Sequence, residues 1–96
     1  MKIRNINGIL DTTCRCGSWL NHWKNFSGQA VPPLCTVSGC KNKDLVGAHV
    51  QKGNGSMDHK WYIYPLCGDH NNYEGELEVS NIYKLVSANN KETCEK

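Results

Sequence analysis

Two short pairs of residues, Cys35-x4-Cys40 and Cys67-x2-His70, constrain this chain more than any other feature of its sequence. The pairs lie far apart along the chain, so the four side chains converge only when it folds. Cysteine and histidine are the ligands that Zn²⁺ takes in tetrahedral structural sites. Closing each short loop costs little entropy, and only the long connection between the pairs is costly. The spacing therefore predicts a structural zinc site formed by Cys35, Cys40, Cys67 and His70.

Length and composition predict a single domain, residues 1–96, whose hydrophobic core is thin. Only 39% of the 96 residues are hydrophobic, and the chain has one Phe against nine Gly. Such a chain buries a modest share of its surface, so a bound metal would contribute much of its stability. Six cysteines fit either the disulfides of a secreted domain or the metal ligands of an intracellular one.

The sequence gives an expectation about location. The segment Met1-Lys-Ile-Arg-Asn-Ile-Asn-Gly8 lacks an apolar signal-peptide core, which favours the reducing cytoplasm. No stretch approaches the length of a membrane span. We therefore expect a cytoplasmic protein without a membrane partner.

The net charge of +2 permits contact with DNA or RNA phosphates without indicating it. A loose group of lysines surrounds the central stretch: Lys41, Lys43, Lys52 and Lys60. A solvated protein face accounts for these lysines at least as well as a nucleic-acid contact.

A helix is predicted from Ser18 to Ser27. Ser18 is a good N-cap, and Gly28 supplies a left-handed stop. Apolar residues recur at helical spacing and predict one buried face: Trp19, Leu20, Trp23 and Phe26. We interpret this face as core rather than as a platform for stacked bases.

Strands are predicted at 45–50 and 61–64, paired antiparallel, with Pro65 closing the second. A helix should then begin at Cys67 and run to about Tyr73. Shorter strands are expected near 77–79 and 82–86, and a strand, turn and second strand are expected within the first 13 residues.

Three cysteines remain once the central four ligands are assigned. Together with His22, the remaining Cys14, Cys16 and Cys94 would form a second four-ligand metal set. A disulfide from Cys14 or Cys16 to Cys94 and three unpaired thiols are the alternatives, and cysteine arithmetic leaves all three open.

The order of motifs between Cys35 and Asn72 resembles the zinc-stabilised HNH endonucleases. A Cys-x3-Gly-Cys hairpin leads to a strand ending in His49-Val50, and a second strand runs into Pro65-Leu-Cys-Gly-Asp-His-Asn71. The resemblance implies an α+β fold with a ββα-metal, or treble-clef, core at about residues 35–75 and an added N-terminal amphipathic helix. It also implies a structural zinc at the four central ligands, with His70 standing where the family more often has cysteine.

The catalytic part of the resemblance is incomplete. In the family, the first strand ends in a metal-binding Asp or His followed by a histidine that acts as general base. Here this pair is Ala48-His49, and Asn71 stands where the family's last metal-binding histidine lies. His49 could deprotonate a water, since imidazole titrates near neutrality, but Ala48 cannot hold a divalent metal.

Three functions remain open. The first is a catalytically degenerate HNH-like module that binds a nucleic acid or a protein partner. The second is an active metal-dependent endonuclease with His49 as base and Asn71 as metal ligand. The third is a small structural protein held by disulfides. The sequence leaves open whether the protein is an enzyme, and it does not indicate an oligomeric state.

Overall fold

A computed structural model describes residues 1–6, 18–53, 57, 60–73 and 75–88 of the chain. Five strands and two helices occur in the order β1 (Lys2–Asn5), α1 (Trp19–Ser27), β2 (Leu45–Lys52), β3 (Tyr62–Cys67), α2 (Gly68–Asn71), β4 (Glu76–Glu78) and β5 (Val86–Ser87). The strands form one antiparallel sheet in the order β4-β1-β2-β3-β5. The predicted α+β class is confirmed at this level.

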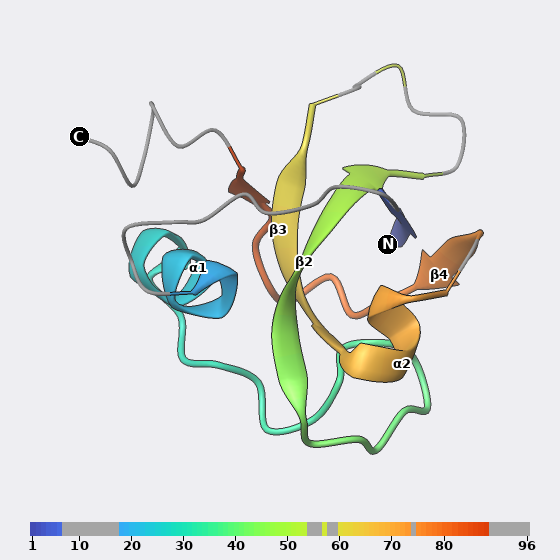
Figure 1. Ribbon diagram of the computed structural model, residues 1–96, viewed down its shortest axis with the longest axis horizontal. Coiled ribbons are helices and arrows are strands. Elements are labelled where there is room, and N and C mark those ends of the chain that lie inside the picture. Colours follow the sequence, from blue (N-terminus) through green and yellow to red (C-terminus); the bar gives the residue numbers. More distant parts are fainter. Residues whose placement is uncertain (7–17, 54–56, 58–59, 74, 89–96) are drawn as a thin grey trace.

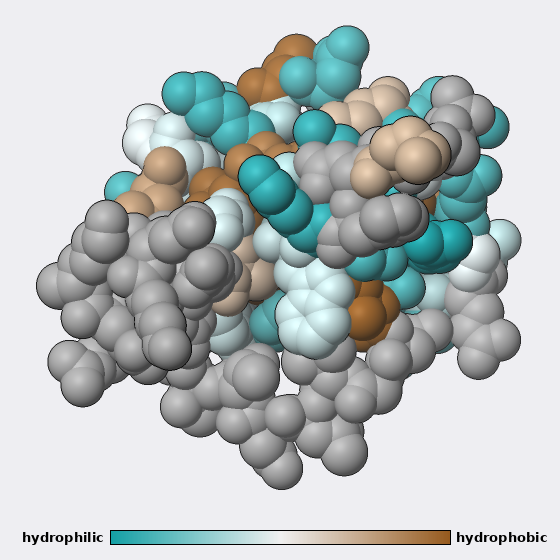
Figure 2. Space-filling view, turned by 90° about the horizontal axis from the view of Figure 1, so that it is seen from above, coloured by the Kyte–Doolittle hydropathy of each residue, from teal (hydrophilic) through white to brown (hydrophobic). Residues whose placement is uncertain are grey.

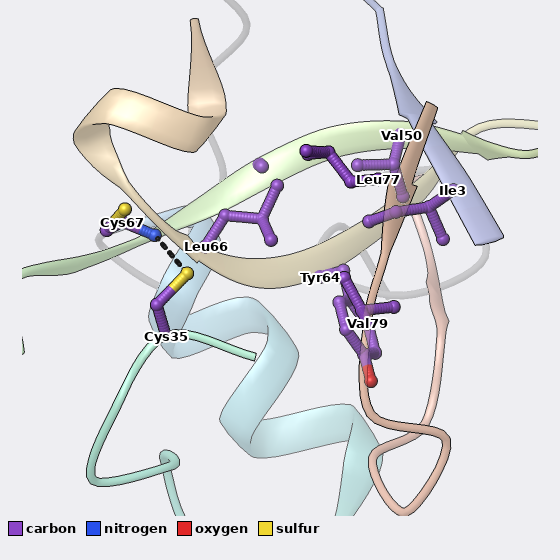
Figure 3. Close-up of a cluster of buried hydrophobic side chains, with 9 residues drawn as sticks. Ile3, Cys35, Val50, Tyr64, Leu66, Cys67, Leu77 and Val79 are labelled. Atoms are coloured by element: carbon purple, nitrogen blue, oxygen red, sulfur yellow. Dashed lines mark hydrogen bonds between the residues drawn. The ribbon is translucent and has the colours of Figure 1, made fainter. Parts of the chain in front are cut away.

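The two faces of the sheet carry different cores, because successive side chains of a strand point to opposite faces. The larger cluster lies on the face away from α1 and continues toward the end of β3 (Figure 3): Ile3, Cys35, Ala48, Val50, Tyr64, Leu66, Cys67, Leu77 and Val79. On the opposite face, Trp23 of α1 packs on Ile63 and Val86. Figure 1 shows α1 beside the β2–β3 pair and α2 at the end where β3 stops.

The local signals of α1 act as the sequence predicts. The Ser18 side chain accepts a hydrogen bond from the Asn21 backbone N–H at 3.1 Å, and Gly28 ends the helix at φ 70°. The buried face differs from the prediction, however. Trp23 and His22 are fully buried, whereas Phe26 is 47% exposed.

The sequence predicted that Pro65 closes the second strand, and this prediction is wrong because β3 continues to Cys67. Pro65 pairs with Gly47 of β2, and its carbonyl accepts a hydrogen bond from Thr36 Oγ1 at 2.8 Å. The backbone N and O atoms of a strand residue point to the same side. Because the Pro65 carbonyl points away from β2 toward Thr36, the Pro65 nitrogen, which has no hydrogen to donate, also points away from β2. On that side, β5 pairs with Tyr62 and Ile63. Proline is tolerated where the sheet needs no donor.

The strand predicted near 77–79 is β4, but the strand predicted near 82–86 is largely wrong, because β5 covers only Val86–Ser87 and the chain before it is not paired as a strand. β2 and β3 pair as expected, and α2 begins after Cys67 but ends at Asn71 rather than near Tyr73. In the strand–turn–strand segment predicted within the first 13 residues, the first strand is β1. The second strand of that segment falls outside the described residues. Hydrophilic side chains cover much of the described surface in Figure 2, with apolar residues in small areas between them. No helix in the described part of the chain is long and apolar enough to cross a membrane.

Candidate metal centre

The first half of the centre is the loop that carries Cys35 and Cys40, between α1 and β2. The Cys40 N–H donates to the Val37 carbonyl at 3.0 Å, and Gly39 between them has φ 81°. A residue with a side chain rarely adopts this left-handed conformation, which glycine takes at little cost. The Cys35 N–H also donates to the Asn42 carbonyl at 2.8 Å, so the loop folds back on itself.

The second half is the junction of β3 and α2. Cys67 ends the strand and stands at the N-cap of the helix, and His70 follows three positions later. Residues three apart on a helix lie on the same side. The Cys67 sulfur and His70 Nδ1 are consequently 3.2 Å apart.

The four side chains predicted from the sequence meet at one point. One ligand atom from each of Cys35, Cys40, Cys67 and His70 can be chosen so that all four lie within 4.8 Å of one another. Tetrahedral zinc with ordinary bond lengths places two sulfurs about 3.8 Å apart and a sulfur and a nitrogen about 3.6 Å apart. The Cys40 and Cys67 sulfurs are 4.0 Å apart, and Cys35 Sγ lies 3.6 Å from His70 Nδ1. The donor set and its spacing fit a tetrahedral metal ion.

The same distances argue against a disulfide within the group. A sulfur–sulfur bond is about 2.05 Å long, about half the separation of Cys40 and Cys67. All three cysteines of the group are free thiols. The Cys67 backbone N–H also points at the Cys35 sulfur, 3.3 Å away (Figure 3). Hydrogen bonds of this kind orient metal ligands from the second coordination sphere.

Cys35 and Cys40 lie in different electrostatic environments. Burial raises the pKa of the Cys35 thiol to about 11, while hydrogen bonding with the Asn42 backbone lowers the pKa of Cys40. Metals bind the thiolate rather than the thiol. A divalent cation would supply the positive charge that three neighbouring thiolates need.

Two polar residues that sequence reasoning missed connect the centre to the sheet. The hydroxyl of Thr36 donates to the Pro65 carbonyl on β3. The backbone carbonyl of Thr36 accepts a hydrogen bond from the Ser80 N–H at 2.9 Å. On the other side, the side-chain amide of Asn5 donates to the carbonyl of His70. Nothing in the local sequence marks either residue, because both act through partners distant in the chain.

His49 lies on the face of β2 that α1 covers. Its ring makes an edge contact with Trp19, at 4.7 Å between centroids. Burial, and to a lesser extent the nearby His22, lower its pKa, which favours the neutral imidazole. Ala48 points to the opposite face and is 1% exposed within the larger core cluster. Asn71 is the last residue of α2, and its predicted role as a metal ligand stays a prediction.

His22 is fully buried in α1, and its Nε2 lies 2.8 Å from the Ser87 carbonyl. Since a carbonyl only accepts, Nε2 carries the proton in the neutral ring and Nδ1 is the atom able to bind a metal. Cys14, Cys16 and Cys94 lie outside the described residues, so the second metal site stays a prediction. Within the described part of the chain, the central group is the one set of three or more such ligands close enough to hold a metal.

Comparisons with known proteins give no family for the chain. No protein-family model matches it, and neither a curated protein nor a solved structure is significantly similar to it.

Proposed function

We propose that this protein is a zinc-stabilised module with an HNH-like, treble-clef core. The observation that carries the proposal is the convergence of three cysteine sulfurs and His70 Nδ1 at tetrahedral spacing. Soft thiolates with one imidazole favour Zn²⁺ over hard cations such as Mg²⁺. Bound zinc would cross-link the Cys35–Cys40 loop to α2 and contribute directly to folding free energy.

The order of elements around the ion supports the HNH-like assignment. A cysteine loop precedes the antiparallel pair β2 and β3, and the junction of β3 with the short helix α2 supplies the other two ligands, Cys67 and His70. This is the order that the resemblance to zinc-stabilised HNH endonucleases implies. Four protein ligands leave no open position for substrate, as in structural rather than catalytic zinc sites.

We propose further that the module is catalytically degenerate. Ala48 occupies the position of a metal ligand in the family, and it is buried among Val50, Tyr64 and Leu66. His49, the proposed base, is partly buried under α1 against Trp19. The environments of both residues favour structural roles, and the function that remains is binding of a nucleic acid or a protein partner.

Metal stoichiometry tests the proposal. Native mass spectrometry and elemental analysis of the purified chain should give at least one zinc per chain, lost in Cys67→Ser. A stoichiometry of one supports the central site alone. A stoichiometry of two that falls to one on joint replacement of Cys14, Cys16 and Cys94 by serine adds the second predicted site. Protein that folds without metal would contradict the proposal.

Partner binding is tested separately. Fluorescence anisotropy with labelled single- and double-stranded DNA and RNA, at low and physiological salt, would detect a nucleic-acid partner. Affinity that falls steeply with salt is the signature of phosphate contacts. Absence of binding at both salt concentrations would leave the protein partner as the proposed function.

A further inference from the structure

The helix that carries His70 cannot hold its own orientation. α2 spans four residues, Gly68–Asn71, far fewer than an isolated helix needs for stability. Its N-terminal end is fixed by Cys67 in β3. The direction of the His70 imidazole therefore depends on what holds the other end of this single turn.

Asn5 of β1 holds that end. Its Nδ2 donates to two carbonyls, that of His70 and that of Tyr73 at 3.2 Å. The His70 carbonyl belongs to the only turn of α2, and Tyr73 lies two residues beyond the last residue of that helix, Asn71. The Tyr73 N–H also donates to the His70 carbonyl, at 3.2 Å, so the amide binds at the point where the chain turns out of α2.

The amide is itself rigidly placed. Asn5 is 8% exposed and pairs with Val50 of β2, and the next residue, Ile6, donates its N–H to the His49 carbonyl at 3.0 Å. Its amide orientation follows from its partners, since two carbonyls can only face the NH2 group. Asn5 thus connects the sheet by a hydrogen bond to the backbone of His70, a metal ligand 65 positions away in sequence.

The other half of the amide shows that local hydrogen bonding does not by itself explain this residue. Asn5 Oδ1 is buried without a hydrogen-bond partner, the one such side-chain atom in the described residues. A buried acceptor left unpaired destabilises the fold. Asn5 is present despite this destabilisation, and its amide joins two carbonyls at or near the candidate ligand His70. We therefore look for its role at the metal.

We propose that Asn5 is a positioning residue of the metal centre: by holding the carbonyls of His70 and Tyr73, it aims His70 Nδ1 at the ion. The inference rests on the proposed metal binding. Residues that orient metal ligands from outside the coordination sphere typically change metal affinity about 10- to 100-fold when replaced.

The test compares Asn5→Ala with Ile3→Val, a control on the same strand. Ile3 is fully buried and pairs with Leu77 and Lys52, so its truncation perturbs β1 away from α2. Zinc affinity is measured by chelator competition, and cobalt is titrated as a spectroscopic substitute. We expect Asn5→Ala to bind zinc about 10-fold or more weakly, with Ile3→Val within about threefold of the wild type.

The cobalt spectrum separates positioning from general destabilisation. At saturating cobalt, loss of stability leaves the ligand-field bands unchanged, whereas a displaced imidazole shifts them. We expect Asn5→Ala to shift these bands in the direction of a His70→Ala reference, and Ile3→Val to match the wild type. If Asn5→Ala does not fold, Asn5→Ser, which keeps one hydrogen-bond donor, carries the same comparison.

Two results would overturn the inference. A saturated spectrum of the Asn5 variant identical to that of the wild type would mean that the residue is merely structural, whatever its affinity. Failure of the wild type to bind zinc or cobalt would overturn the proposed function and this inference with it. The first failure is seen only in the variant and the second already in the wild type, so the two are distinguishable.

Discussion

Gly47 of β2 lies directly against the backbone of Trp19 at the start of α1. A Cβ at Gly47 would lie 2.7 Å from the Trp19 carbonyl oxygen and 2.5 Å from the backbone nitrogen of Leu20. Real Cβ contacts are essentially never this short, and backbone atoms cannot rotate away as a side chain can. The helix can therefore approach the sheet this closely only because position 47 has no side chain.

Gly47→Ala should push α1 off the sheet and lower the free energy of unfolding by about 1–3 kcal/mol, the usual range for an overpacked site. Urea denaturation followed by tryptophan fluorescence measures the change. Gly68→Ala is the matched control, because a Cβ there meets nothing within 4 Å. Equal stability of the two variants would contradict the close packing of α1.

Cys67→Ser should unfold the protein, rather than leave a folded protein that has lost only its function. Structural zinc contributes on the order of 10 kcal/mol to the folding of small domains, and Cys67 belongs both to the candidate metal ligands and to the larger core cluster. A chelator should unfold the wild type in the same way, and added zinc should refold it. A Cys67→Ser protein with native amide dispersion and an unchanged Tm would refute this prediction.

Trp23→Ala should destabilise the fold by roughly 3–5 kcal/mol, as truncation of a large buried aromatic residue does. Trp23 is fully buried, and its Nε1 donates to the Lys84 carbonyl at 2.7 Å. Trp61→Ala is the control, because the Trp61 side chain is 48% exposed. Thermal denaturation of both variants gives the comparison, and a Trp23 variant as stable as the Trp61 variant would show that Trp23 is not core.

Tyr64 should make the fold sensitive to alkaline pH. Burial raises the pKa of its phenol, and the hydroxyl donates to the Ser80 carbonyl. Because the folded pKa is above the unfolded value, this contribution is fully present below about pH 10 and declines as the pH rises further. The slope is at most about 1.4 kcal/mol per pH unit.

Urea denaturation of the wild type and Tyr64→Phe between pH 8 and pH 11 isolates this contribution, since other titrating groups are common to both proteins. Tyr64→Phe should be less stable at pH 8, and the difference should shrink at pH 11. A constant difference across the range would mean that the Tyr64 phenol ionises as freely in the folded chain as in the unfolded one.

The protein should show little or no nuclease activity, and any cleavage should depend on His49. Without a held divalent cation, a nuclease loses a Lewis acid that contributes several kcal/mol to the stabilisation of the transition state. Each 1.36 kcal/mol is about a factor of ten in rate. Wild type and His49→Ala are compared on supercoiled plasmid with Mg²⁺, Mn²⁺ and Ni²⁺. Robust cleavage that disappears in a folded His49→Ala protein would favour the endonuclease hypothesis instead.

Features encoded by neighbouring residues could be predicted from the sequence. The caps of α1 at Ser18 and Gly28 depend on contacts within one turn. The pairing of β2 with β3 follows from two strand-forming segments joined by one loop. The four candidate metal ligands were identifiable because each pair is closely spaced and the chemistry of cysteine and histidine is distinctive.

Features that depend on distant partners were not predictable. A proline normally ends a strand. Pro65 is accepted within β3 because its carbonyl is bound by the distant Thr36 hydroxyl and its nitrogen faces away from β2. The buried His22 has a distant partner in the Ser87 carbonyl, whereas Phe26, whose ring contacts that of His22, is 47% exposed. Asn5 reads as an ordinary polar residue until β1 is placed beside α2.

The position of β1 between β2 and β4 also sets the order in which the chain can assemble. The Val79 N–H donates to the Met1 carbonyl at 2.8 Å, across a separation of 78 positions. Joining segments this far apart costs more loop entropy than closing β2 on β3, and non-local pairing slows folding. During synthesis on the ribosome, β1 is made before β2 and β4, and it cannot complete its pairing until both of these strands have been made. The β2–β3 hairpin can form in the meantime, and pulse-labelling hydrogen exchange should find the amides of β3 protected before those of β1.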